Sequence, residues 1–124
     1  RQRQMCIRDS ADCVWHAHQA ALAVVRPGVS AGALDEAARA VINDAGYGPY
    51  FGHSTGHGVG VDIHEHPWVR SGSSEELVAG SVFTIEPGIY LPERGGVRIE
   101  NTYVLEDSGN VRSLQALSAE LLHV

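Results

Sequence analysis

Histidines and carboxylates with the chemistry of metal ligands occur in three glycine-flanked stretches of the chain. The first is HSTGHGVGVDIHEHP, which begins at His53 and contains His57 and His64. Glu86 follows in TIEPGIY, and Glu100 in GVRIEN. One histidine and two carboxylates form a ligand set that suits a divalent metal ion. The sequence therefore predicts a metal site, although three ligands leave the coordination of such an ion incomplete.

The spacing of the first two histidines does not indicate a helical zinc site. His53 and His57 are four residues apart, which on a helix would place both on one metal. Three glycines from residue 56 to residue 60 disfavour a helix, and the chain has no HExxH motif. The glycines instead indicate a tight backbone that delivers imidazoles into a site.

Alternation of residue types predicts a strand over residues 59–63, within VGVDI. In such a strand Val61 and Ile63 share one face. We expect that face to be buried and His64 to point the opposite way.

Each carboxylate has two readings from its local sequence. Glu86 ends an apolar strand just before Pro87, where it is either a surface charge at a loop entry or a buried ligand. Glu100 has Arg98 two residues before it, on the same face of a strand. These two residues are either an ion pair on the surface of the strand or a metal ligand with its orienting partner. The local sequence leaves both choices open.

Composition places the chain among single-domain globular proteins. Its 124 residues are 44% hydrophobic and 19% charged, which is enough for one hydrophobic core. The formal net charge of -6 argues against nucleic-acid binding, and no apolar run is long enough to span a membrane. The two cysteines, Cys6 and Cys13, form no CxxC pair, so we expect free thiols in a reducing, cytoplasmic compartment.

Two helices followed by short strands are expected to hold the candidate ligands. Apolar spacing predicts helices over 11–25 and 31–45, the second with Ser30 as its N-cap and Gly46 just after its end. β-Branched and aromatic residues predict strands at 59–63, 81–86, 88–91, 97–105 and 111–114. A further short helix is expected at 115–122.

Several segments and polar side chains are expected to lie outside the core. Residues 1–10 resemble translated sequencing-adapter read-through, so we set them aside as a non-native or disordered leader. His16 and His18, in the first helix, are expected at surface or half-buried positions. The solvated face of the second helix is expected to carry Asp35, Glu36, Arg39 and Asp44.

Taken in order, GHGVG, DIHEHP, TIEPGIY and GVRIEN resemble the motifs of the pita-bread metallopeptidases, which include methionine aminopeptidase, Xaa-Pro aminopeptidase and Xaa-Pro dipeptidase (prolidase). The resemblance covers residues 11–124. It is closer to the Xaa-Pro branch, because Ile99-Glu100 departs from the phenylalanine-glutamate pair typical of methionine aminopeptidases. It implies an α+β, creatinase/aminopeptidase-like fold, incomplete here, in which two N-terminal helices precede a mostly antiparallel curved sheet. Residues 11–124 would be the C-terminal part of the catalytic domain.

The resemblance implies a site for two divalent metal ions, with manganese first among manganese, cobalt, iron and zinc. His57 would be the single histidine ligand, Glu86 a ligand and proton shuttle, and Glu100 a ligand of both ions. A hydroxide bridging the two ions would attack the scissile carbonyl of an Xaa-Pro bond.

Three more residues receive roles on the substrate side from the resemblance. His64 would contact the substrate and stabilise the tetrahedral intermediate, and His53 would line the pocket near the proline-side carbonyl. Arg98 would steady Glu100. The partner would be a peptide substrate with proline in its second position, and homo-oligomer formation by the parent protein is left open.

The chain departs from the family in two of the five metal ligands. The family has two aspartates upstream of the first helix, whereas Asp35, Asp44 and Asp62 fall in segments that match other parts of it. We therefore expect a C-terminal fragment, nearly inactive by itself, of a metal-dependent exopeptidase. The alternatives are a non-catalytic pita-bread module that binds peptides or proteins, and a creatinase-like sister hydrolase.

Overall fold

The computed structural model describes the backbone of residues 2–115 and the side chains of residues 7–115. Helices α1 (Gln2–Ala23) and α2 (Ala31–Asp44) come first, followed by the 3-10 helix η1 (Gly48–Tyr50). The strands are β1 (Gly56–Gly58), β2 (Glu65–Val69), β3 (Val82–Ile85), β4 (Gly88–Leu91), β5 (Gly95–Arg98), β6 (Asn101–Leu105) and β7 (Val111–Ser113). Every pairing between these strands is antiparallel, which agrees with the predicted α+β class.

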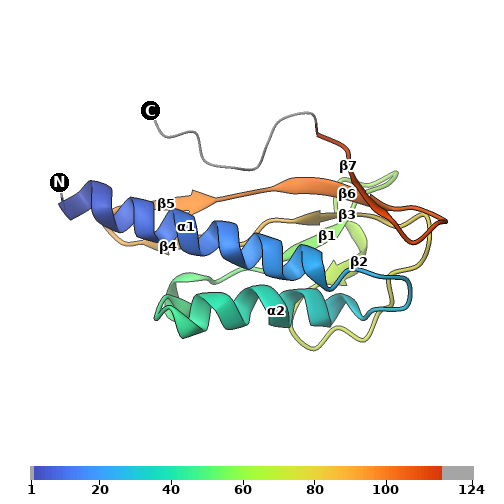
Figure 1. The fold of residues 1–124 in the computed structure, drawn as a ribbon, viewed down its shortest axis with the longest axis horizontal. Helices are drawn as coiled ribbons and strands as arrows, with labels where there is room; N and C mark the ends of the chain where they lie inside the picture. The colour runs from blue at the N-terminus through green and yellow to red at the C-terminus, as the bar shows by residue number, and fades with distance from the viewer. Residues whose placement is uncertain (1, 116–124) are drawn as a thin grey trace.

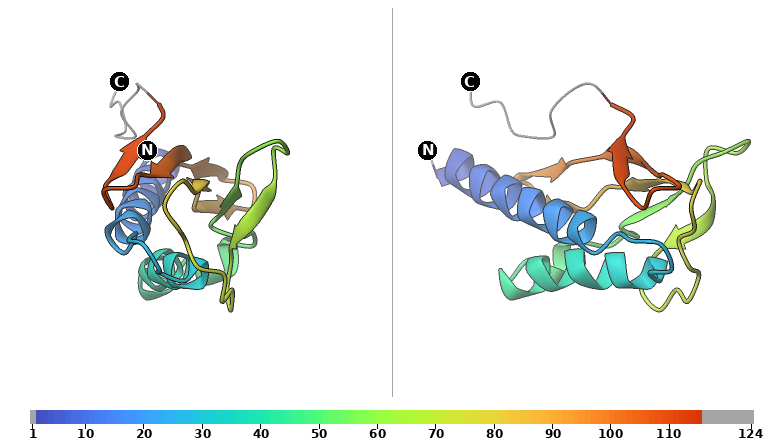
Figure 2. Two further views of the ribbon diagram at one scale, coloured as in Figure 1. Left: turned by 90° about the vertical axis from the view of Figure 1, so that its right-hand side faces the viewer. Right: turned by 45° about the vertical axis from the view of Figure 1, so that its right-hand side comes forward.

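The two helices lie side by side, and the strands curve over one face of the pair (Figures 1 and 2). Five strands form one sheet in the order β2-β1-β3-β6-β7, and β4 pairs with β5 in a second sheet. Apolar side chains from both layers fill the space between them, because neither layer can bury its apolar face alone. The most buried of these side chains include Val14, Leu34, Ile42, Phe83, Ile85 and Leu105.

Helix α1 is longer at its start than the sequence predicts. The expected helix over 11–25 begins instead at Gln2 and ends at Ala23, so it includes most of the decamer set aside as a leader. Met, Arg and Gln are good helix formers, and the decamer lacks glycine and proline, which explains the extension. That residues 1–10 are non-native remains a prediction. No helix in the described residues is long and apolar enough to cross a bilayer.

Helix α2 begins and ends where its capping residues predict. The Ser30 hydroxyl accepts a hydrogen bond from the Ala33 N–H at 3.2 Å, which satisfies a free donor of the first turn. Gly46 follows the last turn with a φ of 86°, a left-handed conformation that glycine adopts without strain. Glu36 and Asp44 are exposed, as predicted.

Asp35 is buried, and its predicted place on the solvated face of α2 is wrong. Its carboxylate is 0% exposed and accepts two hydrogen bonds from Arg39, at 2.9 and 3.0 Å, and one from the Thr55 hydroxyl at 2.8 Å. Arg39 is partly buried and also donates to the carbonyl oxygens of Phe51 and His53. The helical pattern cannot show this, because the segment that covers Asp35 comes from elsewhere in the chain. The ion pair anchors residues 51–55, which lead into β1.

His18 is also buried, contrary to its predicted surface or half-buried position. Its side chain is 0% exposed, while His16 is exposed. The two ring nitrogens of His18 reach the Ile99 carbonyl oxygen at 3.2 Å and the Tyr103 hydroxyl at 2.7 Å. Since both partners lie in the sheet layer, the sequence of the helix alone gives no sign of them.

The predicted strand over 59–63 is wrong. These residues form the turn that joins β1 to β2, and the side chains of Val61 and Ile63 are 103% and 75% exposed. Figure 2 shows this light-green turn projecting from the sheet. Because β1 and β2 pair with each other in antiparallel fashion, the chain between them must reverse direction. The alternating VGVDI pattern imitates a half-buried strand, so pattern alone gives the wrong assignment.

The remaining predicted strands agree closely with β3, β4 and β7, while the strand over 97–105 is interrupted. Residues 99–100 separate β5 from β6, and these two strands have different partners. The turn at 106–110 joins β6 to β7, closed by a 2.8 Å hydrogen bond from the Glu106 N–H to the Asn110 carbonyl. Nearly all of the helix predicted at 115–122 lies outside the described residues.

Replacing Asp35 with alanine should lower the free energy of unfolding by about 3 kcal/mol. The change leaves a partly buried guanidinium and a buried hydroxyl without their acceptor. Urea unfolding of Asp35→Ala and of Glu36→Ala, an exposed acid on the same helix, measures the difference. The control should stay within about 0.5 kcal/mol of the parent chain. Equal losses in the two variants would show that the Asp35 ion pair does not anchor residues 51–55.

Burial should make His18 lower the stability of the fold as the pH falls. Burial lowers the pKa of His18 from its ordinary value of 6.5, so below that value the unfolded chain binds more protons than the folded one. The contribution of His18 is therefore complete above pH 6.5 and is lost as the pH falls toward the folded-state pKa, at up to about 1.4 kcal/mol per pH unit. Unfolding free energies from pH 7.5 to pH 5 should fall less steeply in His18→Gln. Identical slopes would contradict the assignment.

Candidate metal centre

His57 lies in β1 between two residues that must be glycine. A Cβ atom on Gly56 would overlap the Thr84 carbonyl oxygen, and one on Gly58 would overlap the His66 carbonyl oxygen. The glycines let β1 lie close to β2 and β3, with which it pairs. His57, held between them, is 7% exposed.

Hydrogen bonding fixes the ring of His57 in a state suited to a metal ligand. The Nδ1–H donates to the Gly58 carbonyl oxygen at 3.0 Å, because a carbonyl can only accept. In the neutral form of the ring the lone pair is then on Nε2, which faces the Glu86 carboxylate at 3.7 Å. Metal-binding histidines commonly have their second ring nitrogen held in this way.

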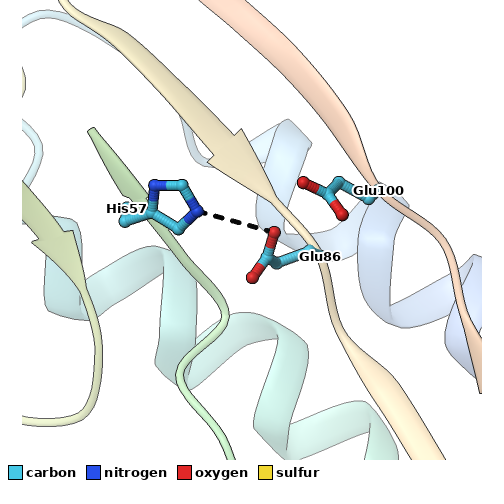
Figure 3. Close-up of side chains that lie close together, drawn as sticks. All are labelled: His57, Glu86 and Glu100. Carbon is cyan, nitrogen blue, oxygen red and sulfur yellow. Dashed lines mark ion pairs between the residues drawn. The ribbon is translucent and has the colours of Figure 1, made fainter. Parts of the chain in front are cut away.

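Glu86 and Glu100 reach the same region from the ends of two strands. Glu86 follows β3, and its N–H donates to the Thr55 carbonyl oxygen at 2.6 Å. Glu100 lies in the break between β5 and β6. One ligand atom from each of His57, Glu86 and Glu100 lies within 4.8 Å of the others (Figure 3). The structure thus brings together the three predicted ligands, and their role as ligands remains a prediction.

The two carboxylates are close enough to disturb each other's ionisation. Burial, together with a hydrogen bond and charge repulsion from Glu100, raises the pKa of Glu86 to about 7, although His57 and Arg98 oppose the shift. The side chain of Glu86 is 15% exposed, so water screens this repulsion poorly. Excess negative charge at two neighbouring carboxylates is relieved by a bound cation. The donor set therefore fits a divalent metal ion.

Arg98 lies beside Glu100 as the sequence suggests. Its Nε is 3.8 Å from a carboxylate oxygen of Glu100, and both side chains are about half exposed, at 52% and 41%. A pair in this setting contributes little to stability. The ion pair is compatible with a role in orienting the Glu100 carboxylate, and that role remains a prediction.

His64 lies next to His57 because of a turn, not as part of the predicted strand. The turn after β1 folds back and brings the two rings to a centroid distance of 4.3 Å with an interplanar angle of 52°. His64 itself is exposed. It lies outside the group of three ligand atoms among the described residues. Its position is suited to contact with a bound molecule.

His53 is held by a tyrosine that sequence reasoning missed. Its Nδ1–H donates to the Ser54 carbonyl oxygen at 2.7 Å, and its Nε2 accepts from the Tyr90 hydroxyl at 2.8 Å. The rings of Phe51 and His53 pack nearly perpendicular to each other at a centroid distance of 5.0 Å. Tyr90 lies in β4, four residues after Glu86, and that proximity is the signal that could have revealed it.

Comparisons with known proteins identify relatives over most of the chain. Residues 4–107 match the model of Metallopeptidase family M24. The Xaa-Pro dipeptidase of Pyrococcus furiosus is 45% identical over 115 residues, which are 93% of this chain and 33% of that protein. The chain therefore spans about a third of the length of this relative.

Solved structures agree with the sequence comparison. The prolidase from Pyrococcus horikoshii superposes with a TM-score of 0.88 at 42% identity, covering 93% of this chain and 33% of that chain. The dipeptidase PepE from Mycobacterium ulcerans gives a TM-score of 0.86 at 44% identity, covering 92% and 30%.

These likenesses confirm the resemblance and the pita-bread fold that the four motifs predict. The match covers both helices and all three segments that contribute a candidate ligand. The family description also implies divalent metal ions, in agreement with the donor set of His57, Glu86 and Glu100. The chain belongs to metallopeptidase family M24.

Proposed function

We propose that the protein to which this chain belongs is a metal-dependent exopeptidase that hydrolyses an Xaa-Pro peptide bond. One observation carries the proposal: an imidazole and two repelling carboxylates converge within 4.8 Å, in a chain 45% identical to an Xaa-Pro dipeptidase. The activity is proposed for the longer protein, because the chain covers 33% of that relative.

The metal ions are proposed to be held by His57, Glu86 and Glu100, with Glu100 shared between two ions. One imidazole with carboxylate oxygens suits manganese, cobalt or iron at least as well as zinc, and manganese is our first choice. When bound, such ions lower the pKa of a coordinated water and polarise the scissile carbonyl. Two aspartates beyond the three ligands found here are proposed to complete the set.

Proton transfer, stabilisation of the developing charge and positioning are assigned to Glu86 and to side chains around the three ligands. Glu86 is suited to hold and release a proton near neutral pH, because its pKa is raised to about 7. His64, exposed beside His57, is placed to donate a hydrogen bond to the oxygen that gains charge as the carbonyl is attacked. His53 lines the pocket in a fixed orientation set by Tyr90, and Arg98 steadies Glu100.

Binding of Mn²⁺ to the chain should release protons near pH 7. A ligand must be deprotonated to bind, and about half of the Glu86 carboxyls carry a proton at pH 7. We expect release of about half a proton per site at pH 7, almost none at pH 8.5, and a fall in affinity below pH 7 that approaches tenfold per pH unit. Titration calorimetry in two buffers of different ionisation enthalpy measures the release.

The Glu86→Gln variant should lose this proton release together with most of the affinity, whereas Glu76→Gln, at an exposed position, should keep both. Proton release that persists in Glu86→Gln would show that another group loses the proton. Absence of Mn²⁺ binding both to the unsubstituted chain and to a version extended upstream through the two aspartates would contradict the assigned ligands.

Xaa-Pro hydrolysis should require a chain that supplies all five ligands. We expect the 124-residue chain to be nearly inactive with Mn²⁺ and a version extended upstream through two aspartates to be active. In the extended version, His57→Ala and Glu100→Ala should each lower activity by more than about 100-fold. His16→Ala, at an exposed histidine of α1, is the matched control and should have little effect.

Hydrolysis of an Xaa-Pro dipeptide and a longer Xaa-Pro peptide gives the readout. Activity in the 124-residue chain would show that the ligand count is wrong. Inactivity of the extended version with five ligands present would exclude the Xaa-Pro assignment, in favour of a creatinase-like hydrolase or a non-catalytic binding module.

A further inference from the structure

Glu100 lies at a point where the backbone has no strand partner. β5 ends at Arg98 and pairs with β4, while β6 begins at Asn101 and pairs with β3. Residues 99 and 100 belong to neither pairing. The position of the Glu100 carboxylate therefore depends on other bonds to this junction.

Two hydrogen bonds hold the junction through Ile99. The Ile99 N–H donates to the Pro87 carbonyl oxygen at 3.3 Å, which ties the junction to the residue after Glu86. The Ile99 carbonyl oxygen accepts from His18 Nδ1 at 3.2 Å. This carbonyl belongs to the same planar peptide unit as the nitrogen of Glu100. A bond that fixes the carbonyl therefore fixes the direction in which the backbone enters Glu100.

A chain of donors and acceptors fixes the state of the His18 ring. Because the Ile99 carbonyl can only accept, Nδ1 carries the proton, and Nε2 accepts from the Tyr103 hydroxyl at 2.7 Å. The side-chain amide of Asn101 in turn donates to the Tyr103 oxygen at 3.4 Å. Trp15 stacks at a centroid distance of 6.5 Å with an interplanar angle of 9°. The buried ring is thus fully partnered and held in one orientation.

A histidine in this place could simply attach α1 to the sheet. That role would be served equally by either ring nitrogen, since Ile99 and Tyr103 both lie in the sheet layer. The Nδ1 bond differs from the Nε2 bond in one respect: it meets the peptide unit that leads into Glu100. The two roles therefore make different predictions for variants that keep one bond and lose the other.

We propose that His18 is a positioning residue, whose Nδ1–H fixes the peptide unit between Ile99 and Glu100 and so places the Glu100 carboxylate opposite His57 and Glu86. The inference rests on the proposed function to the extent that Glu100 is taken as a metal ligand. His18 touches neither metal nor substrate, and it acts through the backbone from 81 residues away in the sequence.

Three variants separate the two bonds. His18→Asn keeps an N–H near the position of Nδ1 and loses the acceptor for Tyr103. His18→Gln keeps a group near Nε2 and loses the donor to Ile99. Tyr103→Phe removes the hydroxyl and leaves the His18 donor in place. All three disturb the same buried site, so a general loss of stability should be similar among them.

Two readouts are taken on the folded chain. The first is hydrogen exchange of the Ile99 amide without metal, relative to amides of the β3–β6 pairing, which reports local opening of the junction. The second is the dissociation constant for Mn²⁺. We expect His18→Gln to speed Ile99 exchange about tenfold and to weaken Mn²⁺ binding about tenfold, while His18→Asn and Tyr103→Phe stay within about threefold of the parent chain.

Equal effects of His18→Gln and His18→Asn on both readouts would overturn the proposal and leave only the attachment role. A loss of Mn²⁺ affinity of about tenfold in Tyr103→Phe, measured against the unsubstituted chain, would overturn it too, and this arm does not depend on the folding of His18→Gln. If the unsubstituted chain binds no Mn²⁺, the three candidate ligands do not hold the ion by themselves, and the proposed function of the longer protein is decided by the hydrolysis test. Ile99 exchange then decides the positioning role by itself: a split between the asparagine and glutamine variants supports it, and no split refutes it.

Discussion

The repulsion between Glu86 and Glu100 is the constraint on which the rest of the structure depends. Burial, together with the proximity of Glu100, raises the pKa of Glu86 to about 7, so the fold holds two carboxylates where one of them resists ionisation. Such an arrangement persists only when the surrounding bonds fix both backbones. Glu86 is fixed by the Thr55 carbonyl, and the junction before Glu100 by Pro87 and His18. A divalent cation bound between the two carboxylates, as proposed, would relieve this repulsion.

Each helix contributes one buried polar residue that helps to fix the backbone at Glu86 or Glu100. From α2, Asp35 binds Thr55 through both its N–H and its hydroxyl, and Thr55 in turn accepts from the N–H of Glu86. From α1, His18 reaches the carbonyl before Glu100. The apolar faces of the helices supply the core, while these two polar contacts transmit the position of the helices to the candidate ligands.

Local signals in the sequence predict only part of this arrangement. Ser30 and Gly46 mark the ends of α2, because capping is a property of a few adjacent residues. The four motifs that contain the candidate ligands are likewise short and continuous, so they can be recognised in the sequence. The burial of Asp35 and His18 is invisible to a helical pattern, since it depends on contacts with Thr55 and Ile99, which lie 20 and 81 residues away. The turn at 59–63 imitates a strand because its alternation matches a half-buried sheet, while the pairing of β1 with β2 decides otherwise.

The most direct test of the central claim is anomalous diffraction at the manganese edge from crystals of the chain grown with Mn²⁺. A peak within about 2.0–2.6 Å of His57 Nε2 and of carboxylate oxygens from both Glu86 and Glu100 is the predicted result. A peak at another cluster, such as His66 with Glu75 on the exposed side of β2, with none between the three residues, would contradict it.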